Sequence, residues 1–180
     1  IYCYGRKSHQ YLNSDDFEKE IFVKVNIAEK LDEYLTNHDL SKSIINLGGV
    51  CDSYQEIEDE YQLMPEVLKV LIKHKQNTII TTKSDLIVRD LDLIEELSQV
   101  SDYVNIALTI THANADLTQY IEPGSSKPKD RFHALKQLKG KAKYTALHFM
   151  PILPCFSDDK KSLEQITRWA AEAEVDYMMT

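Results

Sequence analysis

Short runs of β-branched residues alternate along this chain with longer stretches in which apolar residues recur at helical spacing. This alternation is typical of βα units, whose strands lie parallel to one another in one sheet. It predicts strands at residues 21–25, 43–50, 77–82, 103–109, 144–151 and 175–179. It predicts four helices. The first spans residues 65–75, the second begins after Asp90 as its cap, and the third lies between Pro128 and Gly140. The fourth has Leu163, Ile166, Thr167 and Ala170 on its inward face.

The 180 residues suffice for one domain with a sizeable core, and no linker or low-complexity segment divides them. We do not expect a complete eightfold barrel, because such barrels typically have about 250 residues. We therefore expect an α/β fold over residues 1–180: a single partial (β/α)6 TIM-like barrel, with parallel strands inside and helices outside.

Several expected strands end in polar, turn-like segments, at residues 48–53, 81–85, 109–112 and 151–154. In parallel α/β folds the loops at the carboxyl ends of strands converge and form the active site. We expect these four segments to face one another. His112, at a strand end, is a candidate to line the site, whereas His148, within an apolar strand, is expected to be a satisfied core histidine.

The net charge of −8 argues against a general nucleic-acid surface, because such surfaces bind phosphates through Lys and Arg. The basic run at 127–143, which includes Arg131, is interpreted as a solvated helix face. Three cysteines at wide spacing indicate free or metal-bound thiols in a reducing compartment. Because no apolar run approaches the length of a membrane span, we expect a cytoplasmic location and no membrane partner.

The common dinucleotide, nucleoside-triphosphate, zinc-protease and serine-hydrolase motifs are all missing from the sequence. Other segments occur in a recognisable order. They are Tyr2-Cys3-Tyr4, Gly49-Val50-Cys51-Asp52-Ser53, Thr81-Thr82-Lys83-Ser84, Thr109 with Thr111, Ile121-Glu122-Pro123-Gly124-Ser125-Ser126 followed by Pro128 and Arg131, and Met150-Pro151-Ile152-Leu153-Pro154. In order and spacing, this set resembles the radical S-adenosylmethionine enzymes, and within them the spore photoproduct lyase branch.

The resemblance implies a [4Fe–4S] cluster and S-adenosylmethionine as cofactors. Cys3 resembles the third cysteine of the CxxxCxxC cluster motif, and Tyr2 and Tyr4 resemble the tyrosines that lie against the cosubstrate. Lys83 would meet the methionyl carboxylate, the Ser53 and Thr109 hydroxyls would orient the methionine or ribose, and Glu122 would lie at the same site. Cys51 resembles the cysteine that gives a hydrogen atom to the product radical.

The resemblance also implies a reaction class. S-Adenosylmethionine would be cleaved reductively to a 5′-deoxyadenosyl radical, with electrons from a donor such as flavodoxin or ferredoxin. A DNA photoproduct is one possible substrate, although the acidic composition supports nucleic acid only weakly. The first two cluster cysteines and the strand before them are missing, so we expect a fragment that is inactive alone. Its unpaired sheet edge predicts a homodimer.

Other interpretations of these residues stay open. Cys3 fits an incidental terminal cysteine, Cys51 a small buried hydrophobe, Lys83 a surface lysine and Glu122 a turn former. Two other functions are consistent with such a barrel. One is a non-enzymatic scaffold or interaction module, and the other is a cluster-free lyase in which Lys83 forms a Schiff base.

Overall fold

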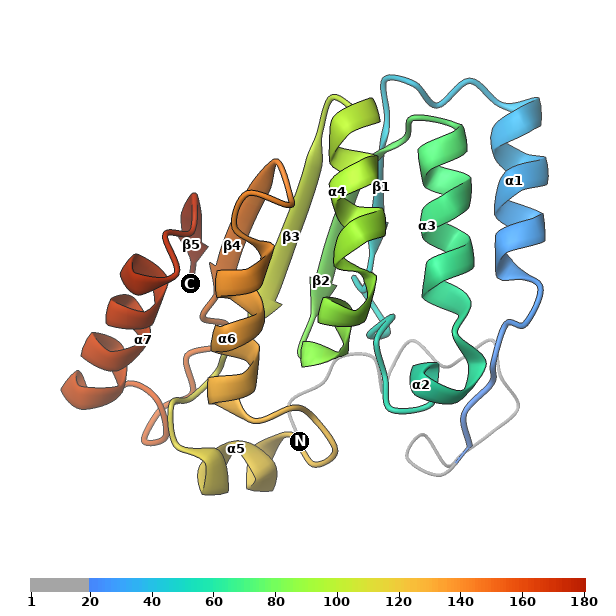
Figure 1. The fold of residues 1–180 in the computed structure, drawn as a ribbon. Coiled ribbons are helices and arrows are strands. Elements are labelled where there is room, and N and C mark those ends of the chain that lie inside the picture. The colour runs from blue at the N-terminus through green and yellow to red at the C-terminus, as the bar shows by residue number, and fades with distance from the viewer. Residues whose placement is uncertain (1–19) are drawn as a thin grey trace.

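The computed structural model describes residues 20–180, which form one open sheet of five parallel strands (Figure 1). The strands follow one another in the sheet in the order of the chain. Their bounds are β1 Ile44–Leu47, β2 Asn77–Thr82, β3 Val104–Thr109, β4 Tyr144–His148 and β5 Tyr177–Met179. This arrangement confirms the predicted α/β partial barrel.

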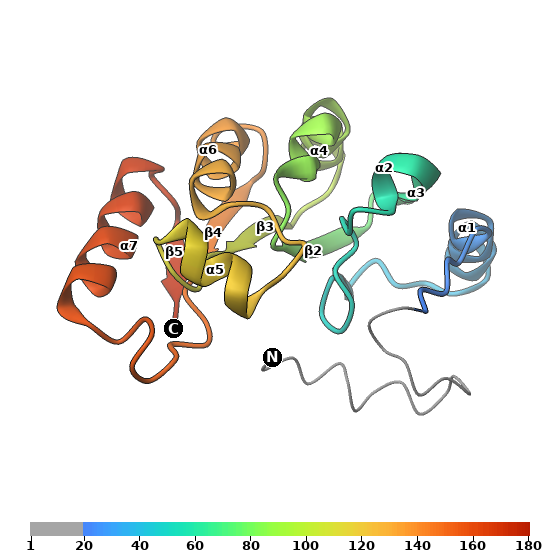
Figure 2. The same ribbon diagram turned by 90° about the horizontal axis from the view of Figure 1, so that it is seen from below.

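The long helices cover one face of the sheet, and the other face is concave (Figure 2). The helices are α1 Ile27–Asn37, α2 Glu58–Tyr61, α3 Leu63–Lys73, α4 Leu91–Val100, α5 Ala115–Ile121, α6 Pro128–Leu138 and α7 Lys160–Glu172, with a 3-10 helix at Asp85–Asp90 before α4. None of the helices within residues 20–180 is long and apolar enough to cross a membrane.

The hydrophobic core lies between the sheet and this helical layer. Alternate strand residues point to opposite faces of a sheet, so every second apolar side chain meets the helices. Fully buried members of the core include Leu68, Ile80, Ile94, Ile106, Leu108, Leu135, Leu147 and Ile166. All six residues of β3 are buried, as expected for a central parallel strand.

The predicted strand at residues 21–25 is wrong. Ile21, Phe22 and Val25 are exposed, and the backbone bonds locally, with the Val25 N–H donating to the Val23 carbonyl. Residues 21–24 have no regular secondary structure, and a turn at residues 25–26 leads into α1, a helix that the sequence analysis missed. None of the strands within residues 20–180 pairs with this apolar run, so its β propensity is not met by a partner strand. The described residues therefore contain five strands rather than six.

Two details of the predicted helices also need correction. In α7 the inward residues are Ser162, Ile166, Trp169 and Ala170, whereas Leu163 and Thr167 are exposed. Asp90 precedes α4 as expected, but its side chain bonds the Arg89 guanidinium instead of capping the helix. A neighbouring cation competes successfully for the carboxylate because charge-assisted hydrogen bonds are the stronger ones.

Candidate functional site

The parallel ladder brings the carboxyl ends of the strands to one edge of the sheet. Leu47 pairs with Ile80, Thr82 with Leu108, and Thr109 with His148. The loops that follow β1, β2, β3 and β4 therefore start side by side, as the sequence predicts. We refer to this region as the carboxyl edge.

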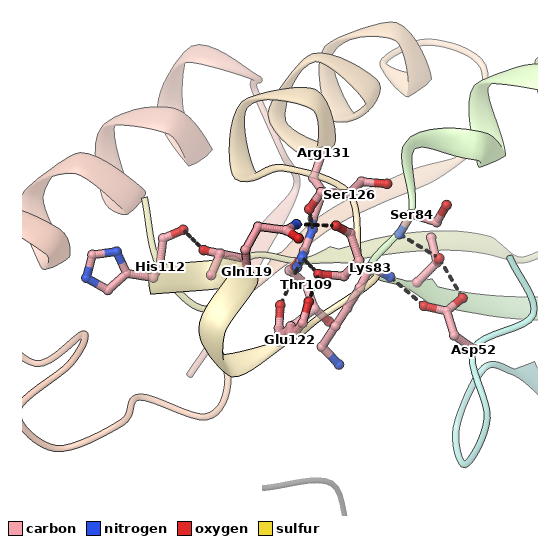
Figure 3. Close-up of polar contacts among 12 residues, drawn as sticks. Asp52, Lys83, Ser84, Thr109, His112, Gln119, Glu122, Ser126 and Arg131 are labelled. Atoms are coloured by element: carbon pink, nitrogen blue, oxygen red, sulfur yellow. Dashed lines mark hydrogen bonds and ion pairs between the residues drawn. The ribbon is translucent and has the colours of Figure 1, made fainter. Parts of the chain in front are cut away.

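Asp52 joins the first two of these loops. Its Oδ1 accepts hydrogen bonds from the Tyr54 N–H at 2.9 Å and the Thr82 hydroxyl at 2.7 Å, and its Oδ2 accepts one from the Lys83 N–H at 2.7 Å (Figure 3). A carboxylate that bonds one backbone amide on each of two loops fixes their relative position. Asp52 thereby fixes the position of the Lys83 backbone at the end of β2.

Gly48 allows β1 and β2 to approach each other at this edge. Its φ is +84°, and a Cβ built there would lie 2.0 Å from the Thr81 carbonyl oxygen. Both the left-handed backbone and the contact distance require glycine. The turn after β1 can therefore place Cys51, Asp52 and Ser53 beside the end of β2.

Three of the predicted site residues lie on these two loops. Cys51 is exposed and its Sγ accepts a hydrogen bond from Gln55 Nε2 at 2.7 Å, while Ser53 is half-buried two residues further on. Lys83 is half-buried as well, and its side chain points away from the helical layer (Figure 3). The ammonium thus lies on the concave side of the carboxyl edge.

Arg131, in the first turn of α6, organises the next loop. Its side chain is fully buried, and its Nη1 donates to the Thr109 carbonyl at 2.8 Å. The same guanidinium bonds the Ser126 carbonyl, the Ser125 hydroxyl and, at 2.9 Å, the Glu122 carboxylate (Figure 3). One arginine therefore joins the end of β3 to the loop between α5 and α6, and brings Thr109 and Glu122 together.

The burial of Arg131 corrects the interpretation of the basic run as a solvated helix face. Arginine is almost never fully buried unless it is paired, and here the guanidinium meets four acceptors. Glu122 is likewise more than a turn former, because it is buried and forms an ion pair with Arg131. The lysines of the same run that are exposed, such as Lys127 and Lys129, fit the original interpretation.

His112 belongs to a buried network at the start of α7. Its Nδ1 accepts a hydrogen bond from the Asn114 N–H at 2.7 Å, and its Nε2 lies 3.3 Å from the Ser162 hydroxyl. Ser162 in turn donates to Asp159, the residue that caps α7. These bonds require the neutral tautomer with hydrogen on Nε2. The ring connects the loop after β3 with α7, so His112 has a structural role.

His148, the last residue of β4, lies on the concave face. Its neighbour Leu147 packs in the core, so the imidazole points the other way. Burial, and secondarily the positive charge of Lys83, lowers the pKa of His148 below its ordinary value. Its Nε2 has no hydrogen-bond partner among residues 20–180. The expectation of a satisfied core histidine is therefore wrong.

Other predicted site residues cannot be located. Tyr2, Cys3 and Tyr4 lie outside the described residues, and their roles stay predictions. Between residues 20 and 180, no three His, Cys, Asp or Glu side chains are placed to bind a metal ion together. The described part of the chain thus does not by itself fit an iron–sulfur cluster.

Sequence reasoning missed Asp52, the structural role of Arg131 and the concave position of His148. Asp52 offered one signal, an acidic residue three positions after the Gly48-Gly49 pair that follows a strand, where backbone amides of the next loop are available. For Arg131 a deciding contact comes from Thr109, 22 residues away in sequence, and for His148 the deciding factor is which face of β4 packs in the core.

No family model matches the chain. Among curated proteins, an uncharacterized protein of Mycobacterium tuberculosis (strain ATCC 25618 / H37Rv) is 29% identical over 175 residues, covering 96% of this chain and 51% of that protein. An uncharacterized protein of Methanocaldococcus jannaschii is 31% identical over 157 residues, covering 87% and 57%. The chain thus spans about half the length of these curated relatives.

Two solved structures are similar to this chain in fold. A spore photoproduct lyase complexed with dinucleoside spore photoproduct matches with a TM-score of 0.68 at 15% identity, covering 97% of this chain and 49% of that one. SuiB of Streptococcus suis bound to S-adenosylmethionine matches with a TM-score of 0.55 at 17% identity, covering 88% and 34%. The chain therefore has the partial-barrel fold of these radical S-adenosylmethionine enzymes.

Proposed function

We propose that this chain forms the cosubstrate-binding part of a radical S-adenosylmethionine enzyme related to spore photoproduct lyase. The observation that carries the proposal is the carboxyl edge, where Lys83 follows β2, Thr109 ends β3 and Glu122 follows α5, in the order that the resemblance implies. The shared fold with spore photoproduct lyase over 97% of the chain supports it.

The chemistry of the edge suits an amino-acid carboxylate joined to a nucleoside. The Lys83 ammonium, on the concave side, offers a point charge to the carboxylate. Hydroxyls of Ser53 and Thr109 would bond polar atoms of the cosubstrate, and Arg131 and Asp52 keep the loops that carry these residues in position. When bound, S-adenosylmethionine supplies the precursor of a 5′-deoxyadenosyl radical.

The cluster, the substrate and the role of Cys51 are further parts of the same proposal. Cys3 would be one of three cysteine ligands, and an electron donor such as flavodoxin or ferredoxin would deliver the reducing electron. Cys51 is exposed on the loop after β1, an accessible position for a residue that gives a hydrogen atom to a substrate radical. A DNA photoproduct is one candidate substrate.

The test uses the full-length protein, reconstituted anaerobically with iron and sulfide. After reduction with dithionite in the presence of S-adenosylmethionine, we expect release of 5′-deoxyadenosine. The Lys83→Gln variant should bind the cosubstrate roughly ten- to a hundredfold more weakly, because a hydrogen bond to a charged group contributes about 1.5–3 kcal/mol. The measured quantities are the nucleoside yield and the affinity for S-adenosylhomocysteine.

Lys143→Gln provides a matched control, since Lys143 is an exposed lysine directly before β4, at the opposite edge of the sheet. It should keep the wild-type affinity. A reconstituted protein without cluster absorption and without nucleoside release would contradict the proposed function.

A further inference from the structure

A cleft lies between the segment that precedes α1 and the residues around α2 (Figure 1). Its volume is about 360 Å³, and its lining consists of Ile21, Glu56, Ile57, Asp59 and Glu60. Ile21 lies before α1, whereas the other four residues lead into α2 or belong to it. We refer to this surface as the acidic cleft. It shares no residue with the candidate site at the carboxyl edge.

The acidic cleft and the segment beside it present apolar side chains to solvent. Ile21 is 56% exposed, and Phe22 and Val25 in the same segment are 54% and 66% exposed. Ile57, on the other side of the cleft, is half-buried. Single exposed apolar residues are common, but several in one short segment are typical of a surface that another molecule covers. Burial of their apolar area would stabilise such a complex.

The charged side chains of the acidic cleft all have the same sign. Glu56, Asp59 and Glu60 are exposed, and none of them forms an ion pair with a residue between 20 and 180. Glu58 lies among them in sequence but turns inward, where its carboxylate pairs with Arg89 at 2.8 Å. Because no Lys, Arg or His lines the cleft, its lining attracts cations.

This charge pattern determines which kind of partner fits. Nucleic acid is repelled, because its phosphates need basic side chains. Within residues 20–180, no three His, Cys, Asp or Glu side chains are placed to bind one metal ion, so the three carboxylates do not converge on a single point. A second copy of this chain is a poor match, because each copy carries a net charge of −8. Carboxylates spaced around apolar side chains instead match a polypeptide whose basic residues flank an apolar one.

We propose that the acidic cleft is a docking surface for a basic segment of another protein, in which Lys or Arg side chains flank an apolar residue. The apolar residue packs against Ile21 and Ile57, and the basic side chains pair with Glu56, Asp59 and Glu60. Since the acidic cleft lies outside the carboxyl edge, this inference does not depend on the proposed function.

The test measures the binding of fluorescein-labelled peptides to the full-length protein by fluorescence anisotropy. One peptide combines Lys with Leu, a second combines Lys with Ser, and a third combines Glu with Leu. We expect the Lys-Leu peptide to bind, with an affinity that decreases as the salt concentration rises. The other two peptides should bind at least roughly tenfold more weakly, because each lacks one of the two kinds of contact.

Two variants of the acidic cleft identify the surface that the peptide contacts. Glu56→Gln/Asp59→Asn/Glu60→Gln should weaken the Lys-Leu peptide by at least roughly threefold, since exposed ion pairs are individually weak but three are lost together. Ile21→Ser should weaken it by roughly three- to tenfold through the loss of apolar contact area. All four side chains are exposed, so these substitutions should leave the fold intact.

The exposed side of α7 and the residue that follows its end provide matched controls. Glu164→Gln/Glu172→Gln/Glu174→Gln removes the same charge from exposed positions, and Leu163→Ser removes an apolar side chain that is 37% exposed. Both controls should keep the wild-type affinity for the Lys-Leu peptide.

The proposal is overturned if the wild type binds no peptide, or if the control triple variant weakens binding as much as the cleft variant, which would show a response to net charge alone. Equal affinity for the Lys-Ser peptide would remove the role of the apolar side chains. Wild-type dimers in sedimentation that Ile21→Ser abolishes would identify a second copy as the occupant, which also contradicts the proposal. Release of 5′-deoxyadenosine is measured separately, so each of these outcomes leaves the proposed function standing.

Discussion

At the scale of single residues, the carboxyl edge depends most on Arg131. A fully buried guanidinium is costly to dehydrate, and it is stable here because Thr109, Ser125, Ser126 and Glu122 all supply acceptors. The Glu122 carboxylate compensates the charge. The pair is therefore a positioning device for the end of β3 and for the loop that precedes α6.

Removal of the guanidinium should destabilise the protein strongly. Arg131→Met leaves Glu122 buried without its cation, and we expect a loss of about 3–5 kcal/mol in the free energy of unfolding. Glu122→Gln keeps the side-chain shape and one hydrogen-bond acceptor, so the free energy of unfolding should decrease less in this variant. Urea denaturation measures both. Arg168→Met, at an exposed position of α7, should change stability by less than about 0.5 kcal/mol. Equal effects at Arg131 and Arg168 would show that the buried contacts contribute nothing.

At the scale of secondary-structure elements, the close approach of β1 to β2 determines the shape of the first loop. β1 is an edge strand of four residues and joins the sheet through β2 alone among the described strands. The turn at Gly48 and the bonds of Asp52 to Thr82 and Lys83 supplement this short ladder. The loop with Cys51 and Ser53 is thereby fixed by contacts outside the strand itself.

Gly48→Ala tests this arrangement. The new Cβ would lie 2.0 Å from the Thr81 carbonyl oxygen, so β1 and β2 must separate. We expect a loss of at least about 2 kcal/mol, from backbone strain and displaced strand contacts together. Gly140→Ala is the control: φ is +79°, but nothing lies within 4 Å of the added Cβ, and strain alone should cost about 1 kcal/mol. Thermal unfolding of both variants separates the cost of the steric contact with Thr81 from the cost of the left-handed backbone conformation.

At the scale of the whole molecule, the helices enclose one face of the sheet and leave polar groups on the other. The concave face thus combines buried side chains with the charge of Lys83, which is drawn in Figure 3. Such a combination makes global stability depend on pH, because burial in the folded state changes the pH at which His148 binds a proton.

The direction of this dependence follows from the pKa of His148, which burial and the Lys83 charge lower from its ordinary value of 6.5. The unfolded chain binds a proton near pH 6.5, whereas the folded protein binds it only at lower pH. Between these values the unfolded state holds more protons, so stability falls as pH decreases. The contribution of the neutral His148 to the free energy of unfolding is complete above about pH 6.5.

Unfolding curves measured from pH 7.5 to 5 should therefore show a smaller decline in His148→Gln than in the wild type. Lys83→Gln removes one of the two causes and retains burial, so its decline should be intermediate. A His148→Gln protein with the wild-type slope would show that other groups produce the dependence.

The sequence by itself determined the fold class, four of the helices and all five strands within residues 20–180. Hydrophobic periodicity indicates which side chains are buried, and the spacing of the buried side chains distinguishes a helix from a strand. The same signal failed at residues 21–25, an apolar run that pairs with none of the described strands and whose Ile21, Phe22 and Val25 are exposed. Periodicity describes a segment and carries no information about what packs against it.

The sequence also determined which loops form the candidate site, because parallel strands place their carboxyl ends at one edge. Only the tertiary structure decided that Arg131 is buried, that Asp52 joins two loops and that His148 faces the concave side. The first two properties depend on partners distant in the chain, Thr109 for Arg131 and Thr82 for Asp52, whereas the third depends on which face of β4 packs against the helices. A residue's type fixes the bonds that it can form, and the packing of the strands and helices selects those that it does form.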